Sequence, residues 1–294
     1  MITFTQEQQK NLLECFGESF SKELPVKLAY FAKKWQLDDF SFIEYYSVNC
    51  LFICRSTKYG NCVLKIFGCE YEWYIIEIFA LNEYDGKCKY VKAHEFDTEL
   101  GAILLERIVP GVTLKTEPSL EKRLSIFADM WKNAHMVPRD PERFISYLDS
   151  TIRALGKPWS QGENLVLRRI ASEMVAACQS LYAKYPQRLL LHGDLHGDNL
   201  LLNSTGDYTI VDPHGRIGPP ICDLGRFIAN EYADSHAEAR GDTVNYIVKK
   251  LSEELHLPIL DIVQAFFVDI TLMTCWDAED GTVDINGALF AQDL

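Results

Sequence analysis

Apolar positions along the chain change their spacing near residue 40. Over residues 6–24 they recur with helical spacing, and after Pro25 interrupts this pattern a second helical piece runs to about Trp35. Beyond residue 40, short runs rich in β-branched and aromatic residues replace the helical pattern. They predict strands at 42–45, 50–54, 62–67, 90–93 and 102–106, with one helix over 71–83 between the third and the fourth. The first third of the chain is therefore predicted to be a mostly antiparallel sheet that carries one inserted helix.

Helical spacing returns after Pro110 and Gly111 and dominates the remainder. Apolar positions on single helical faces predict helices at 120–131, 144–155 and 167–181. A short non-helical island at 189–220 separates these helices from the C-terminal ones. This order predicts an α+β fold of two lobes, with an active site between them. We expect a small antiparallel β-sheet lobe over residues 1–108 and a mainly helical lobe over residues 109–294.

The balance of charge narrows the range of partners. The chain has 29 Lys and Arg against 42 Asp and Glu, a formal charge of −13, and nucleic-acid binding is not expected because neutralising phosphates requires a basic face. Residues 251–294 contain nine acids and no Lys or Arg. These acids favour a cationic small molecule as the partner, although they could equally serve solubility alone. The oligomeric state stays open.

Cysteine usage and the lack of a membrane signal point to the cytoplasm. The chain has nine cysteines and no Cys-x-x-Cys pair, a pattern typical of reduced thiols rather than a disulfide framework. No basic stretch followed by an apolar run opens the sequence, so no signal peptide is expected. The most apolar stretch, 259–273, is interrupted by Asp261, Gln264 and Asp269 and is too short to cross a bilayer. We expect it to be a buried helix.

The non-helical island carries the chemistry. It contains His192-Gly193-Asp194-Leu195 with Asn199 five residues after the aspartate, which is the His-x-Asp-Leu-x-x-x-Asn spacing of a kinase catalytic loop. Phosphoryl transfer needs a carboxylate to receive the hydroxyl proton and hard oxygen ligands for Mg²⁺. Asp194 is therefore predicted as the catalytic base, and Asn199 with Asp212 as metal ligands. His192 is expected to orient the loop as a buried histidine.

A lysine in the predicted sheet completes this hypothesis. Lys65 lies inside an apolar strand, where its burial would be costly unless an anion compensates it. The following helix offers Glu77 in its middle. We expect Lys65 to hold the nucleotide phosphates while paired with Glu77, because kinases use such a pair. A solvated lysine on an edge strand is the alternative for this residue considered alone.

Two other classes of protein remain open at this point. A metallohydrolase could use His192, Asp194, His196 and Asp198, although zinc catalysis usually relies on several imidazole or thiolate ligands. A nucleotide-binding pseudokinase would lack turnover. Its support is a turn near residues 46–50 that has no glycine for close approach to phosphates.

The motifs at 191–199, 211–215, 104–111 and 222–227 together resemble those of the aminoglycoside phosphotransferase family, in the branch of streptomycin and hydroxyurea-resistance kinases. The resemblance implies a protein-kinase-like fold, with ATP (GTP being possible) and Mg²⁺ as cofactors. It places adenine near Glu106 and Ile108, and phosphate oxygens near Ser47 and Asn49. It makes Asp223 a brace of the catalytic loop. His214 departs from the pattern, since this branch commonly carries lysine there.

The resemblance also implies an acceptor. The leading hypothesis is transfer of the γ-phosphoryl group of ATP to a hydroxyl of an aminoglycoside-like amino sugar. Another small alcohol or hydroxyurea is the alternative acceptor. The candidates for binding a cationic substrate are all acids of the C-terminal half: Glu231, Asp234, Asp277, Glu279 and Asp280.

Overall fold

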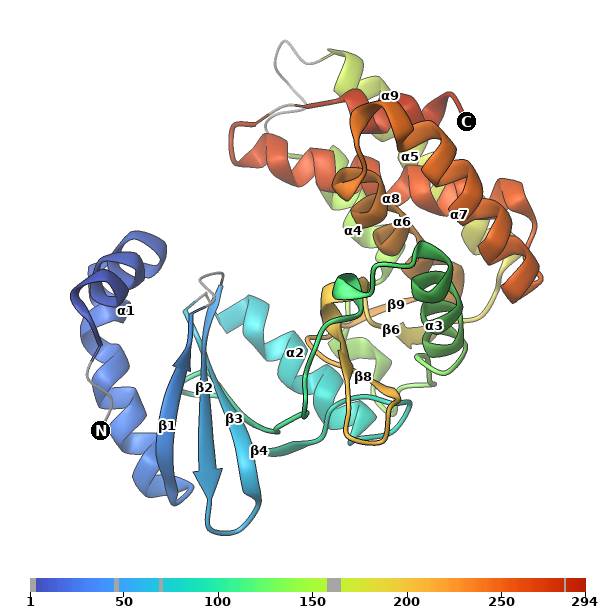
Figure 1. The fold of residues 1–294 in the computed structure, drawn as a ribbon. Coiled ribbons are helices and arrows are strands. Elements are labelled where there is room, and N and C mark those ends of the chain that lie inside the picture. Colours follow the sequence, from blue (N-terminus) through green and yellow to red (C-terminus); the bar gives the residue numbers. More distant parts are fainter. Residues whose placement is uncertain (1–3, 45–47, 69–70, 158–164, 283) are drawn as a thin grey trace. The chain divides into compact units, whose positions relative to one another are not determined.

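The chain divides into two compact units, which are described separately (Figure 1). The computed structural model describes residues 4–44, 48–68, 71–157, 165–282 and 284–294. The N-terminal unit comprises Met1–Gly111 with Leu202–Thr209, and the C-terminal unit comprises Val112–Leu201 with Ile210–Leu294. The first unit thus ends three residues beyond the predicted 108 and takes in a segment from the later island.

A five-stranded antiparallel sheet forms the centre of the N-terminal unit, in the order β1-β2-β3-β5-β4. Its strands are β1 (Leu37–Ile43), β2 (Asn49–Ser56), β3 (Gly60–Phe67), β4 (Ala93–Asp97) and β5 (Ala102–Glu106). The predicted antiparallel sheet is confirmed, but the strand expected at 90–93 is wrong in position. Tyr90 is buried by stacking on Tyr84, with ring centroids 3.5 Å apart, so its aromatic character serves packing and the strand begins later.

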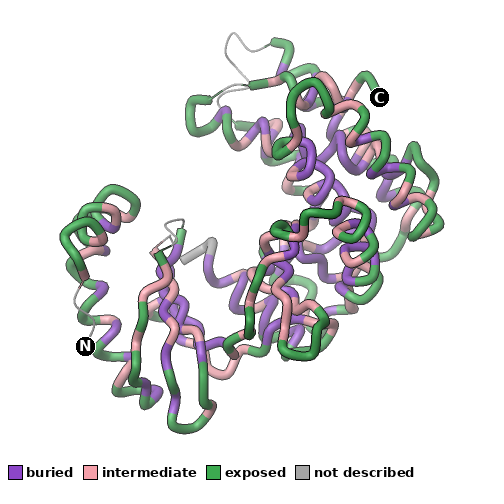
Figure 2. Tube along the Cα trace, in the orientation of Figure 1, coloured by how far each residue is buried: buried purple, intermediate pink, exposed green. Residues whose placement is uncertain are grey.

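Helix α1 (Gln6–Lys34) packs on the sheet and is broken at Gly17 rather than at Pro25. Gly17 has φ +77° and ψ 175°, a backbone conformation that glycine adopts at little steric cost. Pro25 lies inside the second helical piece, so the predicted interruption there is wrong. Beyond the kink, apolar residues such as Leu24 and Phe31 join the core of the sheet. Most of the first piece is exposed (Figure 2).

The two faces of strand β3 serve different purposes, because side chains alternate along a strand. Leu64 and Ile66 join the core cluster that includes α1. Lys65 and Phe67 therefore face the other way, toward helix α2 (Tyr71–Tyr84), where the Phe67 ring stacks on Tyr74 at 5.2 Å. This alternation brings a lysine to the inner side of α2.

Helices dominate the C-terminal unit, as predicted. They are α3 (Leu120–Lys132), α4 (Tyr147–Leu155), α5 (Leu165–Lys184), α6 (Leu224–Asp234), α7 (Arg240–Leu255), α8 (Ile259–Glu279) and α9 (Asn286–Gln292). Helix α8 packs against five of the others. By length and composition α8 could cross a membrane, but 67% of its most apolar window is buried within the protein, which is typical of a core helix (Figure 2). The buried helix predicted at 259–273 is confirmed.

The island between α5 and α6 consists of short strands and single turns. Its strands are β6 (Leu189–Leu191), β7 (Leu200–Leu202), β8 (Tyr208–Ile210) and β9 (Arg216–Gly218). Strand β6 pairs with β9 in antiparallel fashion, and β7 pairs with β8. The polar motifs therefore lie at the ends of strand pairs.

The eight described cysteines are all free thiols. Six of them are buried, and burial raises the pKa of Cys50, Cys54 and Cys275 to about 12. Cys15, on the first piece of α1, is exposed. These thiols thus differ widely in their access to solvent.

Candidate active site

In the N-terminal unit, Lys65 and Glu77 form a closed ion pair. The Lys65 Nζ lies 2.7 Å from both carboxylate oxygens of Glu77, and both side chains are buried. The Lys65 ammonium also lies 5.0 Å from the centroid of the Phe67 ring. Lys65 is on a central strand, between Leu51 of β2 and Ile103 of β5, so the edge-strand alternative does not apply. The pair has the composition that a kinase uses to hold phosphates.

The other nucleotide-site candidates of this unit lie at the ends of strands. Asn49 opens β2 and is buried opposite Phe67, whereas Ser47 lies outside the described residues. Glu106 closes β5, and its side chain accepts a hydrogen bond of 2.7 Å from the backbone N–H of Lys92. Ile108 follows in an irregular, half-buried segment. Asn49, Glu106 and Ile108 thus lie at or just beyond the ends of strands of this sheet.

In the C-terminal unit, the loop that is predicted to be catalytic is anchored on both sides. The carbonyl of His192, which follows β6, accepts hydrogen bonds from the N–H groups of His214 and Gly215 at 2.8 and 3.0 Å. The carboxylate of Asp223 accepts from the N–H groups of His192 and Gly193, both at 2.8 Å. Asp223 thus fixes the backbone of the loop from the start of α6.

The His192 ring is fully committed to internal hydrogen bonds. Its Nδ1 accepts from the N–H of Asp194 at 3.1 Å, so Nε2 carries the proton and donates to the carbonyl of Val211 at 2.8 Å. Burial lowers the pKa of His192 to about 4, which keeps the ring neutral at physiological pH. The ring is neutral and forms a hydrogen bond at each nitrogen. It therefore orients the loop and has no nitrogen left for a metal.

The Asp194 carboxylate lies among three cationic or potentially cationic side chains. Its Oδ2 is 3.5 Å from Nε2 of His196 and 3.6 Å from Nε2 of His214, and its Oδ1 is 3.2 Å from the Arg226 guanidinium. Burial alone would raise the pKa of Asp194, but His214, His196 and Arg226 outweigh it and hold the pKa below its usual range. Asp194 is therefore ionised and able to accept a hydrogen bond from a hydroxyl.

Asn199 and Asp212 are brought together by the β7–β8 hairpin. The N–H of Val211 donates to the carbonyl of Asn199 at 3.0 Å, which places Asp212 one residue from this contact. The side-chain amide of Asn199 donates from Nδ2 to the backbone carbonyl of Asp194 at 2.9 Å. The Oδ1 atom of Asn199 is therefore the one left for a cation. Asp212 has φ +60°, a strained conformation that is concentrated at functional sites. One amide and one carboxylate fit Mg²⁺, which takes few protein ligands and keeps waters and phosphates.

A zinc site does not fit this geometry. Among the residues that the structure describes, no group of three or more His, Cys, Asp or Glu side chains could hold a metal ion. Both ring nitrogens of His192 are occupied, and His196 uses Nδ1 to accept from the N–H of Asp198 at 3.3 Å. The metallohydrolase alternative therefore loses His192 as a ligand and keeps at most one ring nitrogen of His196.

The five acids expected to bind substrate fall into two groups. Three have intramolecular cationic partners: Glu231 is bound through both oxygens by Arg123, Asp234 pairs with Lys115 and Glu279 pairs with Lys157.

The other two, Asp277 and Asp280, have no ion-pair partner among the described residues. Burial and the charges of Asp280 and Asp284 raise the pKa of Asp277, while Arg226 opposes the shift. A cation at the end of α8 would relieve this repulsion.

The structure adds site residues that the sequence does not single out. His135 donates from Nε2 to the Asp223 carboxylate at 3.0 Å, and Arg226 reaches Asp194. The signal for Arg226 is a charged residue within the apolar run at 224–229, which must find an anion if it is buried. Asp269 within apolar α8 is the matching signal. Nothing in the local sequence around His135 indicates its role.

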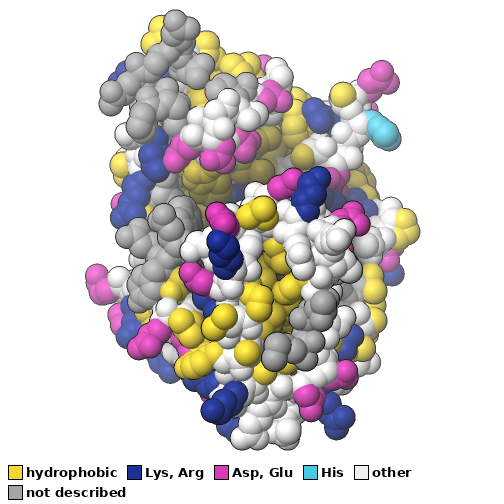
Figure 3. Space-filling model, turned by 90° about the vertical axis from the view of Figure 1, so that its left-hand side faces the viewer, with side chains coloured by type: hydrophobic (Ala, Val, Ile, Leu, Met, Phe, Trp, Pro, Cys, Tyr) yellow, Lys and Arg dark blue, Asp and Glu magenta, His cyan; other side chains and the backbone are white. Residues whose placement is uncertain are grey.

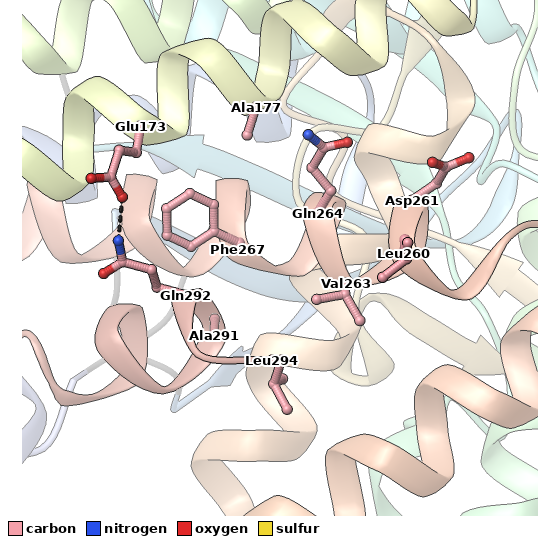
Figure 4. Close-up of a pocket in the computed structure, with 10 residues that line it drawn as sticks. All are labelled: Glu173, Ala177, Leu260, Asp261, Val263, Gln264, Phe267, Ala291, Gln292 and Leu294. Atoms are coloured by element: carbon pink, nitrogen blue, oxygen red, sulfur yellow. Dashed lines mark hydrogen bonds between the residues drawn. The ribbon is translucent and has the colours of Figure 1, made fainter.

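Two other surface features lie outside these motifs. A hollow between α5, α8 and α9 is closed at one side by a hydrogen bond from Gln292 to Glu173 (Figure 4). None of the predicted site residues lines it. On the face drawn in Figure 3, basic and acidic side chains are interspersed, so the residues described there form no continuous basic surface.

Comparisons with known proteins agree with this geometry. Residues 68–281 match the family described as "Aminoglycoside/hydroxyurea antibiotic resistance kinase". Streptomycin 6-kinase of Streptomyces griseus is 24% identical over 207 residues, which span 66% of this chain and 64% of that protein.

Solved structures resemble the chain in fold. The ethanolamine kinase of Plasmodium vivax has a TM-score of 0.66 at 13% identity, with 99% of this chain and 93% of that chain covered. A thermostable mutant of an aminoglycoside phosphotransferase, in a ternary complex with ADP and hygromycin B, has a TM-score of 0.56 at 14% identity, with 90% and 95% covered. The fold is protein-kinase-like. Since the family match spans more than half of its length, the chain belongs to the aminoglycoside/hydroxyurea antibiotic resistance kinase family.

Proposed function

We propose that this protein is an ATP-dependent kinase that transfers the γ-phosphoryl group to a hydroxyl of a small cationic molecule, an amino sugar of the aminoglycoside type. The observation that carries the proposal is the ionised carboxylate of Asp194 on a braced loop, in which the side-chain amide of Asn199, five residues on, donates to the backbone carbonyl of Asp194. The family supports the class of reaction. We place the reaction in the cytoplasm.

Asp194 acts on the acceptor hydroxyl. Its low pKa makes it a weak base before the reaction begins, so it orients the hydroxyl and receives the proton as the bond to phosphorus forms. This suits phosphoryl transfer, whose loose transition state requires little removal of the proton in advance. Asn199 and Asp212 would hold Mg²⁺, which when bound neutralises charge on the phosphates. Lys65, kept in place by Glu77, binds phosphate oxygens.

The nucleotide and acceptor contacts follow from the remaining residues. Adenine lies against the backbone at Glu106 and Ile108, and Asn49, at the start of β2, contacts phosphate oxygens. Ser47 is proposed for the same role from the sequence alone. Asp277 and Asp280 are the acids left to attract an amino group, because Glu231, Asp234 and Glu279 already have cationic partners. A cationic substrate follows from this pair of carboxylates.

Nucleotide turnover with a panel of acceptors tests the proposal. The purified protein, ATP and Mg²⁺ are combined with streptomycin, hygromycin B, ethanolamine, choline or hydroxyurea. ADP release and the mass of the product are then measured. We expect a phosphorylated aminoglycoside. Phosphorylation of a non-sugar only would refute the aminoglycoside acceptor and leave a kinase of another small alcohol.

The variant Asp194→Asn separates a kinase from a pseudokinase. It keeps the size of the side chain and removes the proton acceptor, so turnover should fall by about 10²- to 10⁴-fold while ATP affinity, measured by calorimetry, is retained. ATP binding without turnover by the unmodified protein, across the whole panel, would favour a pseudokinase.

A further inference from the structure

Arg226 connects the catalytic loop to the core of the helical unit. Its guanidinium lies 3.2 Å from Oδ1 of Asp194 and, through Nε, 2.9 Å from Oδ2 of Asp269 on α8. The other oxygen of Asp269 accepts a hydrogen bond of 2.8 Å from the Tyr147 hydroxyl. A chain of contacts thus runs from the Tyr147 hydroxyl on α4 to the Asp194 carboxylate, which is proposed to receive the proton.

This chain is buried, which makes stability a poor explanation for it. The side chains of Arg226 and Asp269 are 12% and 2% exposed. Removing charges from water is costly, and a buried ion pair often stabilises a fold no better than apolar residues of the same size. Moreover, Asp269 alone would neutralise the guanidinium. The second contact, to Asp194, needs a separate reason.

The neighbouring backbone fixes the position of Arg226. A Cβ on Gly225 would lie 2.4 Å from the carbonyl oxygen of Ala265 and 2.6 Å from Cβ of Asp269, so only glycine lets α6 approach α8 this closely. Arg226 is therefore held on a helix whose distance from α8 is set by backbone contact. The planar guanidinium, with donors in a fixed fork, suits a bridge between two carboxylates better than an ammonium does.

We propose that Arg226 is a positioning residue of the transfer reaction. It holds Oδ1 of Asp194 against the helical core, so that Oδ2 is presented to the acceptor hydroxyl in one orientation. The inference rests on the proposed function, since it assigns a role to Asp194 in that reaction. The Arg226 guanidinium also lies 5.4 Å from the ring centroid of Trp276, which neighbours the unpaired Asp277. This contact places the end of α8 next to the positioned carboxylate.

Three variants test the role, with kcat and KM for MgATP and the melting temperature as readouts. Arg226→Lys keeps the charge but cannot bridge both carboxylates, and kcat should fall about tenfold. Arg226→Met should lower kcat about 10²-fold, the effect expected of a catalytic group displaced by about 1 Å. The KM for MgATP should change less than twofold, because Arg226 touches no proposed nucleotide residue.

The double variant Arg226→Met with Asp269→Asn separates positioning from stability. It removes one positive and one negative charge together, so no unpaired charge is left on α8, and the melting temperature should recover toward that of the unmodified protein. The kcat should stay low. Arg123→Lys is the matched control, since Arg123 also makes a half-buried two-point ion pair in this unit. It should lower the melting temperature and leave kcat unchanged.

Two results would overturn the inference. Recovery of kcat together with stability in the double variant would assign Arg226 a purely structural role. Unchanged kcat in Arg226→Lys, with Asp194→Asn inactive, would show that the bridge is not needed. The rate is measured with the fastest acceptor of the panel and with water as acceptor. If Asp194→Asn retained full activity in these assays, the proposed function itself would fail, and the inference with it.

Discussion

The two units hold their buried charges in different ways. In the N-terminal unit, Lys65 and Glu77 form a closed pair on neighbouring elements of the chain. In the C-terminal unit, Asp194 belongs to an open chain of contacts that continues through Arg226 to Asp269. A closed pair keeps a cation in one place for a ligand. An open chain can transmit the position of a helix to a neighbouring group, so in the proposed reaction the two arrangements would serve different purposes.

After Asp194→Asn, the largest expected effect concerns a carboxylate outside both arrangements. Asp212→Ala should lower kcat/KM by about 10³-fold, or about 4 kcal/mol, because the strongest proposed Mg²⁺ ligand is lost. Rates over a range of Mg²⁺ concentrations, together with nucleotide affinity, measure the effect. The control is Asp207→Ala, since Asp207 makes an exposed pair with Lys89. Equal rates for the two variants would contradict the assignment of Asp212.

The ion pair of Lys65 and Glu77 is tested by substituting each partner in turn. Glu77→Gln leaves the Lys65 charge buried and unbalanced and should lower the free energy of unfolding by about 3–5 kcal/mol. Lys65→Met should cost a similar amount and also lower kcat about 10²-fold, because the phosphates lose their anchor. Urea denaturation and turnover measure the two effects.

A double variant at this pair sharpens the comparison with the open chain. Lys65→Met with Glu77→Gln should regain stability but not rate, as expected for the double variant at Arg226. A wild-type rate in Lys65→Met would show that the lysine has no part in phosphate binding.

The loop of the C-terminal unit should be sensitive to acid. His192 has an ordinary pKa of 6.5 and a folded-state pKa of about 4, so the unfolded chain binds more protons between these values. The stability due to the neutral ring is complete above pH 6.5 and is lost as the pH falls toward 4, by about 3 kcal/mol. Unfolding free energies of the protein and of His192→Asn, measured across this range, should converge. Parallel curves would contradict a buried neutral ring.

The smallest effect lies in the N-terminal unit. Burial would raise the pKa of Asp97, but hydrogen bonds from Lys34 and from the N–H groups of Leu100 and Glu99 lower it below its ordinary value of 3.8. Its contribution is therefore present above pH 3.8 and is lost as the pH falls through the lower folded-state value. Asp97→Asn should cost about 1 kcal/mol at pH 7 and nothing in strong acid. A cost that persists in acid would contradict this account.

The closed pair could be predicted from the sequence because its members are twelve residues apart and obey local rules. A lysine in an apolar strand requires an anion, and the next helix supplies one at mid-length. The loop motif around Asp194 could also be predicted from the sequence, because the chemistry of phosphoryl transfer fixes the spacing of its residues.

The open chain could not be predicted in the same way. Its members lie at 147, 194, 226 and 269, and only the packing of α4, α6 and α8 brings them together. The sequence does show that Arg226 and Asp269 are charges within apolar runs, but not which charge each one meets. The same limit applies to Glu231, whose partner Arg123 is 108 residues away. The sequence suggests that the Glu231 carboxylate is available to a substrate, whereas in the structure Arg123 binds both of its oxygens.

The burial of sulfur has a practical consequence. Thiolates are the form of cysteine that attacks alkylating reagents, and the raised pKa values of Cys50, Cys54 and Cys275 keep those groups protonated at neutral pH. Cys15 is the exposed cysteine among those described, and it lies on the outer piece of α1. Among the described cysteines, a maleimide fluorophore should therefore attach to Cys15 first in the native protein, and its emission would report on the N-terminal unit as nucleotide is added.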